Sequence, residues 1–155
     1  MNKPKVILLI GHPLCGKSTY IKKNYPTTQV ISRDELILDI YGGDDYNLAF
    51  SEVDQKEVDK MLFKKIKYSS TSNQDVIIDM TNLTQKRRRK SLQYFPNHHK
   101  IAVVFSQLDD DEIIRRNQYR LITEKKSIPL SVIKHMMKNY QEPNKDECFD
   151  EIIYL

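Results

Sequence analysis

Residues 5–18 read KVILLIGHPLCGKS, and this stretch decides the fold. It begins with Lys5–Ile10, a short apolar run typical of a strand that is buried on both faces of a sheet. The next eight residues, Gly11–Ser18, match the pattern G-x-x-x-x-G-K-[ST], and a helix is predicted from about Gly16 to Asn24. A strand, a glycine-bearing loop and a helix in this order predict a phosphate-binding loop. Backbone N–H groups and the positive end of the helix together attract phosphate.

The residue types of this loop fit a bound nucleoside triphosphate. Lys17 is predicted to reach the β- and γ-phosphates, and the Ser18 hydroxyl is predicted to ligate Mg²⁺. Asp79 ends a second apolar run and looks like a Walker B carboxylate, which orients the metal or its water. The expected cofactors are therefore ATP, or another nucleoside triphosphate, and Mg²⁺. The predicted nucleotide-binding residues are Gly11, His12, Pro13, Leu14, Cys15, Gly16, Lys17, Ser18 and Thr19.

Short apolar runs alternate with helical patterns along the rest of the chain. Strands are predicted at 5–10, 29–32, 75–79, 101–105 and 151–154. Helices are predicted at 16–24, 33–41, 50–68, 85–95, 109–125 and 129–140. This alternation favours a single α/β domain over residues 1–155, built around a mostly parallel sheet.

Composition excludes several classes of protein. A hydrophobic fraction of 39% and a charged fraction of 30% argue against a collagen-like, low-complexity or disordered chain. No apolar run approaches the roughly 20 residues of a membrane span, and two cysteines do not make a disulfide framework. We therefore expect a soluble cytoplasmic protein without a membrane partner. The net charge of +4 permits a phosphate-rich partner but does not require one.

The second predicted strand is followed by Ser32-Arg33-Asp34, at the sheet edge where α/β proteins bind their ligands. A carboxylate at this edge, such as Asp34, can accept the proton of a hydroxyl that attacks a phosphate. The alternative is that Ser32 or Asp34 caps the following helix. Spacing alone does not separate the two interpretations.

The third predicted strand is followed by the segment DMTN, residues 79–82. Thr81 and Asn82 are predicted either to hold this loop or to line the site of the phosphate acceptor. In the alternative interpretation, the aspartate and asparagine cap the next helix, which begins after Thr84.

Arg116 and Arg120 are four residues apart and therefore share one face of a predicted helix. On a helix that closes over the active site, they would neutralise charge on the transferred phosphoryl group. Alternatively, they belong to a solvated basic face that is paired with Asp111 and Glu112.

Several other residues carry weaker signals. The basic run at 85–90, QKRRRK, either contacts a nucleic-acid backbone or is a solvated helix face. His98-His99 is interpreted as a solvated turn rather than a metal pair, and His12 as solvent-exposed or in contact with a phosphate. Cys15 is interpreted as a small packing side chain, with a reactive thiol as the alternative.

Taken together, these motifs resemble the kinase domain of the phage-type polynucleotide 5′-hydroxyl kinases, over nearly the whole chain. The matching motifs are Gly11–Ser18, Arg33-Asp34, Asp79-x-Thr81-Asn82 with Arg87-Arg88, Arg116-Asn117 with Arg120, and Ile128-Pro129 with Val132 and Met136. The resemblance implies a three-layer P-loop kinase fold with strand order 2-3-1-4-5 and a helical lid. It implies a kinase that transfers the γ-phosphate of ATP to 5′-hydroxyl ends of DNA or RNA, with Asp34 as general base. The implied catalytic residues are Lys17, Asp34, Arg116 and Arg120, and the implied substrate-binding residues are Arg33, Asp34, Thr81, Asn82, Arg87 and Ile128.

The chain departs from the phage-type pattern in three places. Three residues after the catalytic aspartate, that pattern has an arginine that holds an acceptor phosphate, whereas this chain has Ile37. The lid segment between Arg120 and Pro129 is slightly longer, and no D-x-D-x-T phosphatase motif is present. Two alternatives to a polynucleotide kinase follow. One is a small-molecule kinase that acts on a nucleoside, nucleotide or antibiotic, and the other is a nucleotide-binding module without transfer activity.

Overall fold

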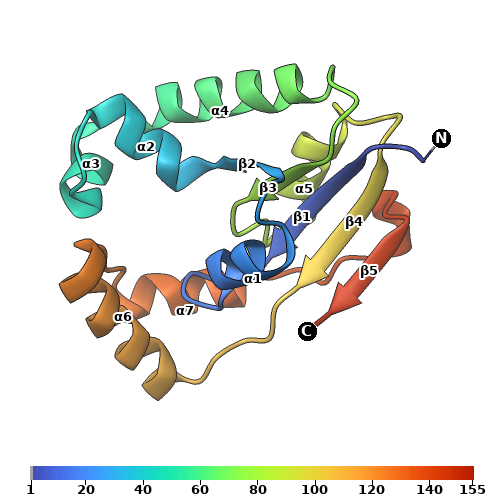
Figure 1. Cartoon of the computed structure of the whole chain (residues 1–155). Helices are drawn as coiled ribbons and strands as arrows, with labels where there is room; N and C mark the ends of the chain where they lie inside the picture. The colour runs from blue at the N-terminus through green and yellow to red at the C-terminus, as the bar shows by residue number, and fades with distance from the viewer. Residues whose placement is uncertain (1) are drawn as a thin grey trace.

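A computed structural model describes residues 2–155 and shows one five-stranded sheet (Figure 1). The strands are β1 (Lys5–Ile10), β2 (Gln29–Ser32), β3 (Val76–Asp79), β4 (His99–Val104) and β5 (Glu151–Tyr154). All four pairings are parallel, and the strand order is β2-β3-β1-β4-β5. This confirms the predicted fold class and strand order. β1 lies at the centre of the sheet, so the loop that follows it opens at the middle of the carboxyl edge.

Helices cover both faces of this sheet and its carboxyl edge. They are α1 (Lys17–Asn24), α2 (Arg33–Tyr41), α3 (Tyr46–Glu52), α4 (Gln55–Ser69), α5 (Gln85–Leu92), α6 (Asp110–Glu124) and α7 (Leu130–Lys138), with a 3₁₀ turn η1 (Lys145–Glu147). Helices α4 and α5 pack on one face of the sheet and α1 packs on the other, while α6 and α7 form the lid (Figure 1). Among residues 2–155, no helix combines the length and the apolar character that crossing a bilayer requires.

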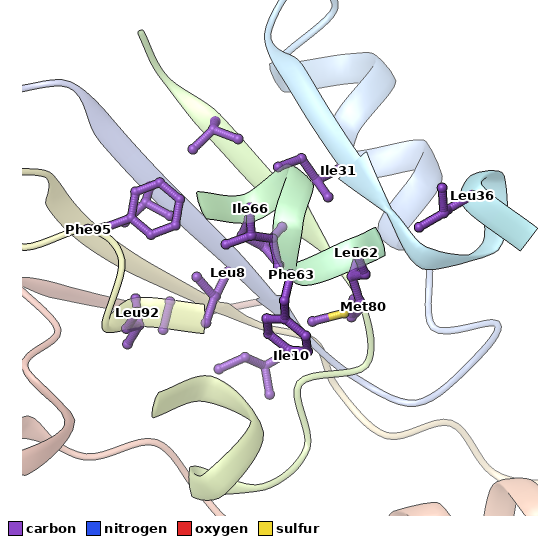
Figure 2. Close-up of a cluster of buried hydrophobic side chains, with 14 of the residues drawn as sticks. Leu8, Ile10, Ile31, Leu36, Leu62, Phe63, Ile66, Met80, Leu92 and Phe95 are labelled. Atoms are coloured by element: carbon purple, nitrogen blue, oxygen red, sulfur yellow. The ribbon is translucent and has the colours of Figure 1, made fainter. Parts of the chain in front are cut away.

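The alternating side chains of β1 belong to two different hydrophobic clusters. Leu8 and Ile10 point toward α4, where they meet Leu62 and Ile66 (Figure 2). Ile7 and Leu9 point to the opposite face and pack with residues of α1. Both faces of β1 are therefore buried, which explains why its sequence is continuously apolar rather than alternating with polar residues.

The prediction of one long helix at 50–68 is wrong, because α3 and α4 are separate helices. Asp54 lies between them, and its side chain accepts a hydrogen bond from the Lys56 backbone N–H at 2.9 Å. This cap satisfies a free amide at the start of α4 and so begins a new helix. The turn η1 was not predicted, and α5 ends three residues before the predicted boundary at Phe95.

Candidate active site

The loop Gly11–Ser18 has a backbone that two glycines make possible. Gly16 has φ +105°, a left-handed conformation that other residues rarely adopt. A side chain at Gly11 would place Cβ 2.5 Å from the Cys15 sulfur and 3.0 Å from Phe105 Cβ. The Lys17 ammonium donates hydrogen bonds of 2.9 Å to the carbonyl groups of residues 11 and 12. The loop is therefore closed tightly around its lysine, and it fits the requirements of a phosphate cradle.

His12 is buried, with 2% of its surface exposed, so the expectation of solvent exposure is wrong. Its Nε2 accepts a hydrogen bond from the Leu108 backbone N–H at 3.1 Å, and Nδ1 donates to the Pro13 carbonyl at 2.6 Å. Burial lowers the pKa of the imidazole, which favours this neutral form. His12 thus ties the loop to the segment between β4 and α6.

Cys15 packs beside Tyr20 and Ile21 in the cluster that α1 forms with the sheet. Burial raises the pKa of its thiol, despite the neighbouring Lys17 ammonium. A raised pKa reduces the thiolate fraction, and the thiolate is the reactive form. These observations favour the packing interpretation of Cys15.

The lid reaches the phosphate loop through Arg116. Its Nη1 donates to the Leu14 carbonyl at 2.8 Å, and its Nε donates to Glu112 at 2.6 Å. Arg115 pairs with the same carboxylate, and the two guanidinium groups lower the pKa of Glu112 to about 2. Arg120 is one turn further along α6 and lines the same cavity as the loop.

Asp34 lies at the start of α2 but does not cap it. Ser32 is the cap, and its hydroxyl accepts a hydrogen bond from the Glu35 backbone N–H at 3.3 Å. The Asp34 side chain is 48% exposed, with one oxygen accepting from the Tyr46 hydroxyl at 2.7 Å and the other paired with the Lys126 ammonium. Partial burial acts to raise the pKa of Asp34, but the charge and hydrogen bond of Lys126, with the bond from Tyr46, hold it below its usual range. Asp34 is therefore ionised at neutral pH.

The β3–α5 segment holds the phosphate loop from the side. The Thr81 carbonyl accepts from the Gly11 backbone N–H at 3.0 Å. Asn82 is buried, and its amide donates to the Leu9 carbonyl at 2.8 Å and, over longer distances, to the carbonyls of Ile78 in β3 and of Met80. Thr84, rather than Asp79 or Asn82, caps α5 through the Arg87 backbone N–H.

Asp79 and Ser18 both line the cavity that contains the phosphate loop. Hydroxyl and carboxylate oxygens are the ligands that Mg²⁺ prefers, so these residues fit such an ion. Burial raises the pKa of Asp79, an effect that a nearby cation would oppose.

The described residues 2–155 contain no group of three His, Cys, Asp or Glu side chains arranged to hold a metal by themselves. The interpretation of His98-His99 as a solvated turn is wrong: His98 is buried against Phe95, with ring centres 4.9 Å apart, and His99 lies in β4 and contacts Glu151.

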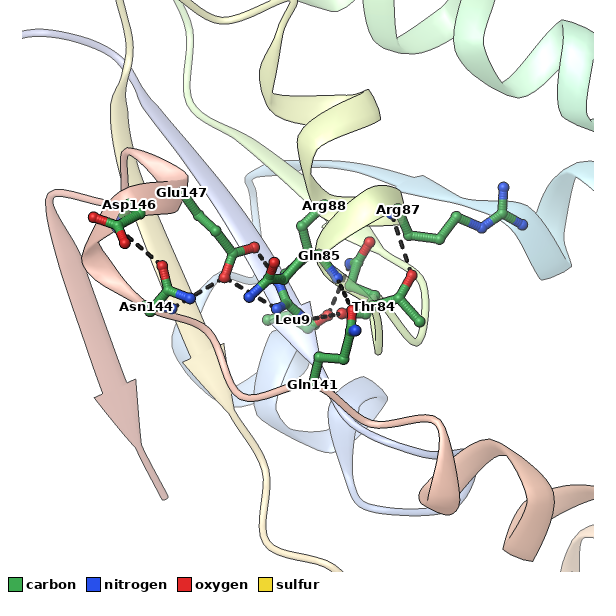
Figure 3. Close-up of polar contacts among 10 residues, drawn as sticks. Leu9, Thr84, Gln85, Arg87, Arg88, Gln141, Asn144, Asp146 and Glu147 are labelled. Atoms are coloured by element: carbon green, nitrogen blue, oxygen red, sulfur yellow. Dashed lines mark hydrogen bonds and ion pairs between the residues drawn. The ribbon is translucent and has the colours of Figure 1, made fainter.

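Arg33 in α2 and Arg87 in α5, the two other arginines predicted to bind substrate, both lie near Asp59 of α4. Arg33 donates to Asp59 at 3.0 Å and to Gln55 at 2.7 Å, and Arg87 lies 3.9 Å from the same Asp59 carboxylate. Arg88, the next residue, is fully buried and pairs with Glu147 instead of facing solvent (Figure 3). The basic run of α5 is therefore interrupted by one structural residue.

A single cavity of about 1820 Å³ joins these parts. The predicted residues that line it are Pro13, Leu14, Cys15, Gly16, Lys17, Ser18, Thr19, Arg33, Asp34, Asp79, Thr81, Asn82, Arg87, Arg116, Arg120 and Ile128. Tyr46 and Lys126 also line it and were not predicted. Neither belongs to a motif, and only the fold brings them to Asp34.

A phosphate loop at the centre of a 2-3-1-4-5 parallel sheet, covered by a helical lid, defines the P-loop kinase class of α/β proteins. The chain belongs to the AAA_33 family, described as an AAA domain, which matches residues 6–143. This membership implies ATP binding at the loop.

Two curated relatives match almost the whole chain but are much longer. Heterogeneous nuclear ribonucleoprotein U-like protein 2 is 27% identical in Mus musculus and 26% identical in Homo sapiens, over 161 residues in each case. The match covers 97% of this chain and 21% of each relative. The chain therefore spans about one fifth of the length of the curated relatives it matches.

Three solved structures share the fold at low sequence identity. Kti12 from Chaetomium thermophilum, in complex with ADP-AlF3, is 17% identical, with a TM-score of 0.67 over 97% of this chain and 88% of that one. A gluconokinase from Sinorhizobium meliloti is 14% identical, with a TM-score of 0.58 over 100% and 83%. A chain of the Pnkp1/Rnl/Hen1 complex is 21% identical, with a TM-score of 0.59 over 74% and 40%. These likenesses show the fold alone.

Proposed function

We propose that this chain is an ATP-dependent polynucleotide kinase that transfers the γ-phosphate to the 5′-hydroxyl of DNA or RNA. The observation that carries the proposal is the ionised Asp34 carboxylate, which shares one cavity with the phosphate loop. In the proposed step the hydroxyl proton passes to Asp34 while the hydroxyl oxygen bonds to the γ-phosphorus. The bond from that phosphorus to the β–γ bridging oxygen breaks, and ADP leaves.

Three cations of the chain serve the phosphates in this proposal. Lys17 leaves the loop carbonyl groups to contact the β- and γ-phosphates, while Arg116 and Arg120 face the transferred group from the lid. Mg²⁺, held by Ser18 and Asp79, would neutralise phosphate charge when bound. A module that only bound nucleotide would need no carboxylate at the position of Asp34.

The exposed face of α5 supports a polynucleotide as acceptor. Lys86, Arg89 and Lys90 are exposed, and a shallow groove of about 480 Å³ runs beside them. Within residues 2–155, the side chains lining this groove are cationic or amide groups and include no carboxylate: Gln85, Lys86, Arg89, Lys90, Gln93 and Gln141. Arg87, between them on the same helix, lines the active-site cavity. Helix α5 therefore presents cations both to the active-site cavity and to this groove, which suits a phosphate backbone.

One observation favours a small-molecule acceptor instead. Ile37 is 0% exposed, because it lies on the face of α2 that packs in the core. The position at which the phage-type pattern has a phosphate-binding arginine therefore faces away from solvent and cannot contact an acceptor. A small-molecule kinase, acting on a nucleoside, nucleotide or antibiotic, is the second candidate.

Transfer of label from γ-labelled ATP separates the two candidates. We expect a 5′-hydroxyl oligonucleotide to be labelled, and the Asp34→Asn variant to be slower by about 100-fold or more because the base is lost. Asp39→Asn, on the exposed side of the same helix, is the matched control and should retain full activity.

Labelling of nucleosides or mononucleotides, with none of the oligonucleotide, would assign the chain to the second candidate. Binding of ATP with no transfer to any acceptor would leave only a nucleotide-binding module. Activity of Asp34→Asn equal to wild type would remove Asp34 from the mechanism.

A further inference from the structure

Lys126 is a buried lysine outside every motif of the sequence. It lies in the connector between α6 and α7, and 8% of its surface is exposed. Lysine is rarely buried without a partner, and here the ammonium contacts two groups. It pairs with one oxygen of Asp34 and lies over the Tyr46 ring, 4.1 Å from its centre. A cation–π contact and an ion pair together fix the head group.

The backbone next to Lys126 is tied to α3. The Ser127 backbone N–H donates to Asn47 at 3.1 Å, and the Asn47 amide donates to the Ser127 hydroxyl at 3.2 Å. Lys125, the residue before Lys126, ends α6 in a left-handed conformation with φ 50°, and its side chain is exposed. The end of the lid thus rests on the acceptor side of the cavity.

We propose that Lys126 is a positioning residue, which holds the Asp34 carboxylate in one orientation while the lid rests on α3. Lys126 and Tyr46 each hold one oxygen of Asp34, so the carboxylate cannot rotate freely. The contribution of this arrangement to catalysis rests on the function proposed above. The arrangement itself is a property of the structure and does not depend on which acceptor is used.

The charges around Asp34 come from several elements of the fold. Those that face this part of the cavity, besides Lys126 and Tyr46, are Lys17, Arg33, Glu35, Asp79 and Arg120. Of the groups that lower the pKa of Asp34, Lys126 has the largest effect, whereas partial burial acts in the opposite direction. Removing the Lys126 charge should therefore raise the pKa of Asp34 and reduce the ionised fraction at acidic pH.

Lys126→Met and Lys125→Met form a matched pair of variants. Each removes one positive charge from the same connector, but only Lys126 contacts the base. We expect Lys126→Met to move the acid limb of the kcat profile upward by about one pH unit or more, whereas Lys125→Met follows wild type. Lys126→Arg, which keeps the charge, should return the acid limb of the kcat profile most of the way to its wild-type pH. Lys126→Gln is a second neutral variant in case methionine disturbs the packing.

A titration of the Asp34 carboxyl carbon by NMR measures the same shift without an acceptor. We expect the pH midpoint of the Asp34 titration to be higher in Lys126→Met than in wild type, and to be unchanged in Lys125→Met. If both midpoints equal wild type in folded protein, the inference is overturned. If no acceptor is phosphorylated but the midpoint rises in Lys126→Met, the inference stands and the proposed function fails.

Discussion

Replacing Arg88 with methionine is expected to lower the free energy of unfolding by about 3–5 kcal/mol. The Arg88 side chain is fully buried, and it donates to both Glu147 oxygens, at 2.7 and 3.0 Å, and to the Asn82 carbonyl at 2.9 Å (Figure 3). Glu147 is nearly as buried, so the variant leaves a carboxylate without its cation. The cost comes from that uncompensated charge rather than from lost packing.

The variant can be measured by urea and thermal unfolding followed by circular dichroism, since the chain has no tryptophan. For a chain of this size, each kcal/mol lowers the Tm by about 2–4 °C, so a loss of about 6–20 °C is expected. Arg89→Met, its exposed neighbour, is the matched control and should stay within about 0.5 kcal/mol of wild type.

Adding Glu147→Leu to Arg88→Met should recover most of the lost stability, because an apolar pair then replaces the ionic one. A loss below about 1 kcal/mol in Arg88→Met would refute this reasoning. So would a double variant that is no more stable than the single one.

Two further predictions concern the phosphate loop. Gly11→Ala should lower the free energy of unfolding by about 1–3 kcal/mol. Adding Cys15→Ala should recover only part of the lost stability, because Phe105 Cβ still lies 3.0 Å from the new methyl group. Full recovery would show instead that Phe105 moves to make room. The pKa of His12 is lowered by burial, so the unfolded chain binds a proton at higher pH than the folded one, and wild-type stability falls as the pH drops below about 6.5. His12→Gln lacks this titration, so its stability deficit in chemical unfolding should shrink between pH 7.5 and 5.5; a constant deficit would contradict the assignment.

Most of the fold could be predicted from the sequence because its signals are local. Buried parallel strands are short apolar runs, and the phosphate loop follows one of them at a fixed spacing. The boundary between α3 and α4 was missed because apolar periodicity continues across it. Asp54 itself was the available signal, since a residue that caps a helix also ends the one before it.

The candidate site could be predicted only where it rests on motifs. Arg88 was grouped with its exposed neighbours, although it shares a helix face with Leu92, four residues on, and both are buried. Tyr46 and Lys126 lie 12 and 92 residues beyond Asp34, and no sequence spacing relates them to it. Their contacts depend on tertiary structure, through α3 and the end of the lid.

The lid contacts both halves of the cavity through one helix. Arg116 of α6 donates to the Leu14 carbonyl in the phosphate loop, and Lys126, two residues after α6 ends, pairs with Asp34. These contacts are separated by eight helical residues, about 12 Å of rigid helix, plus a connector without glycine. A displacement of α6 as a unit therefore breaks both contacts together. It follows that the proposed base is held in this orientation only while the donor loop is covered.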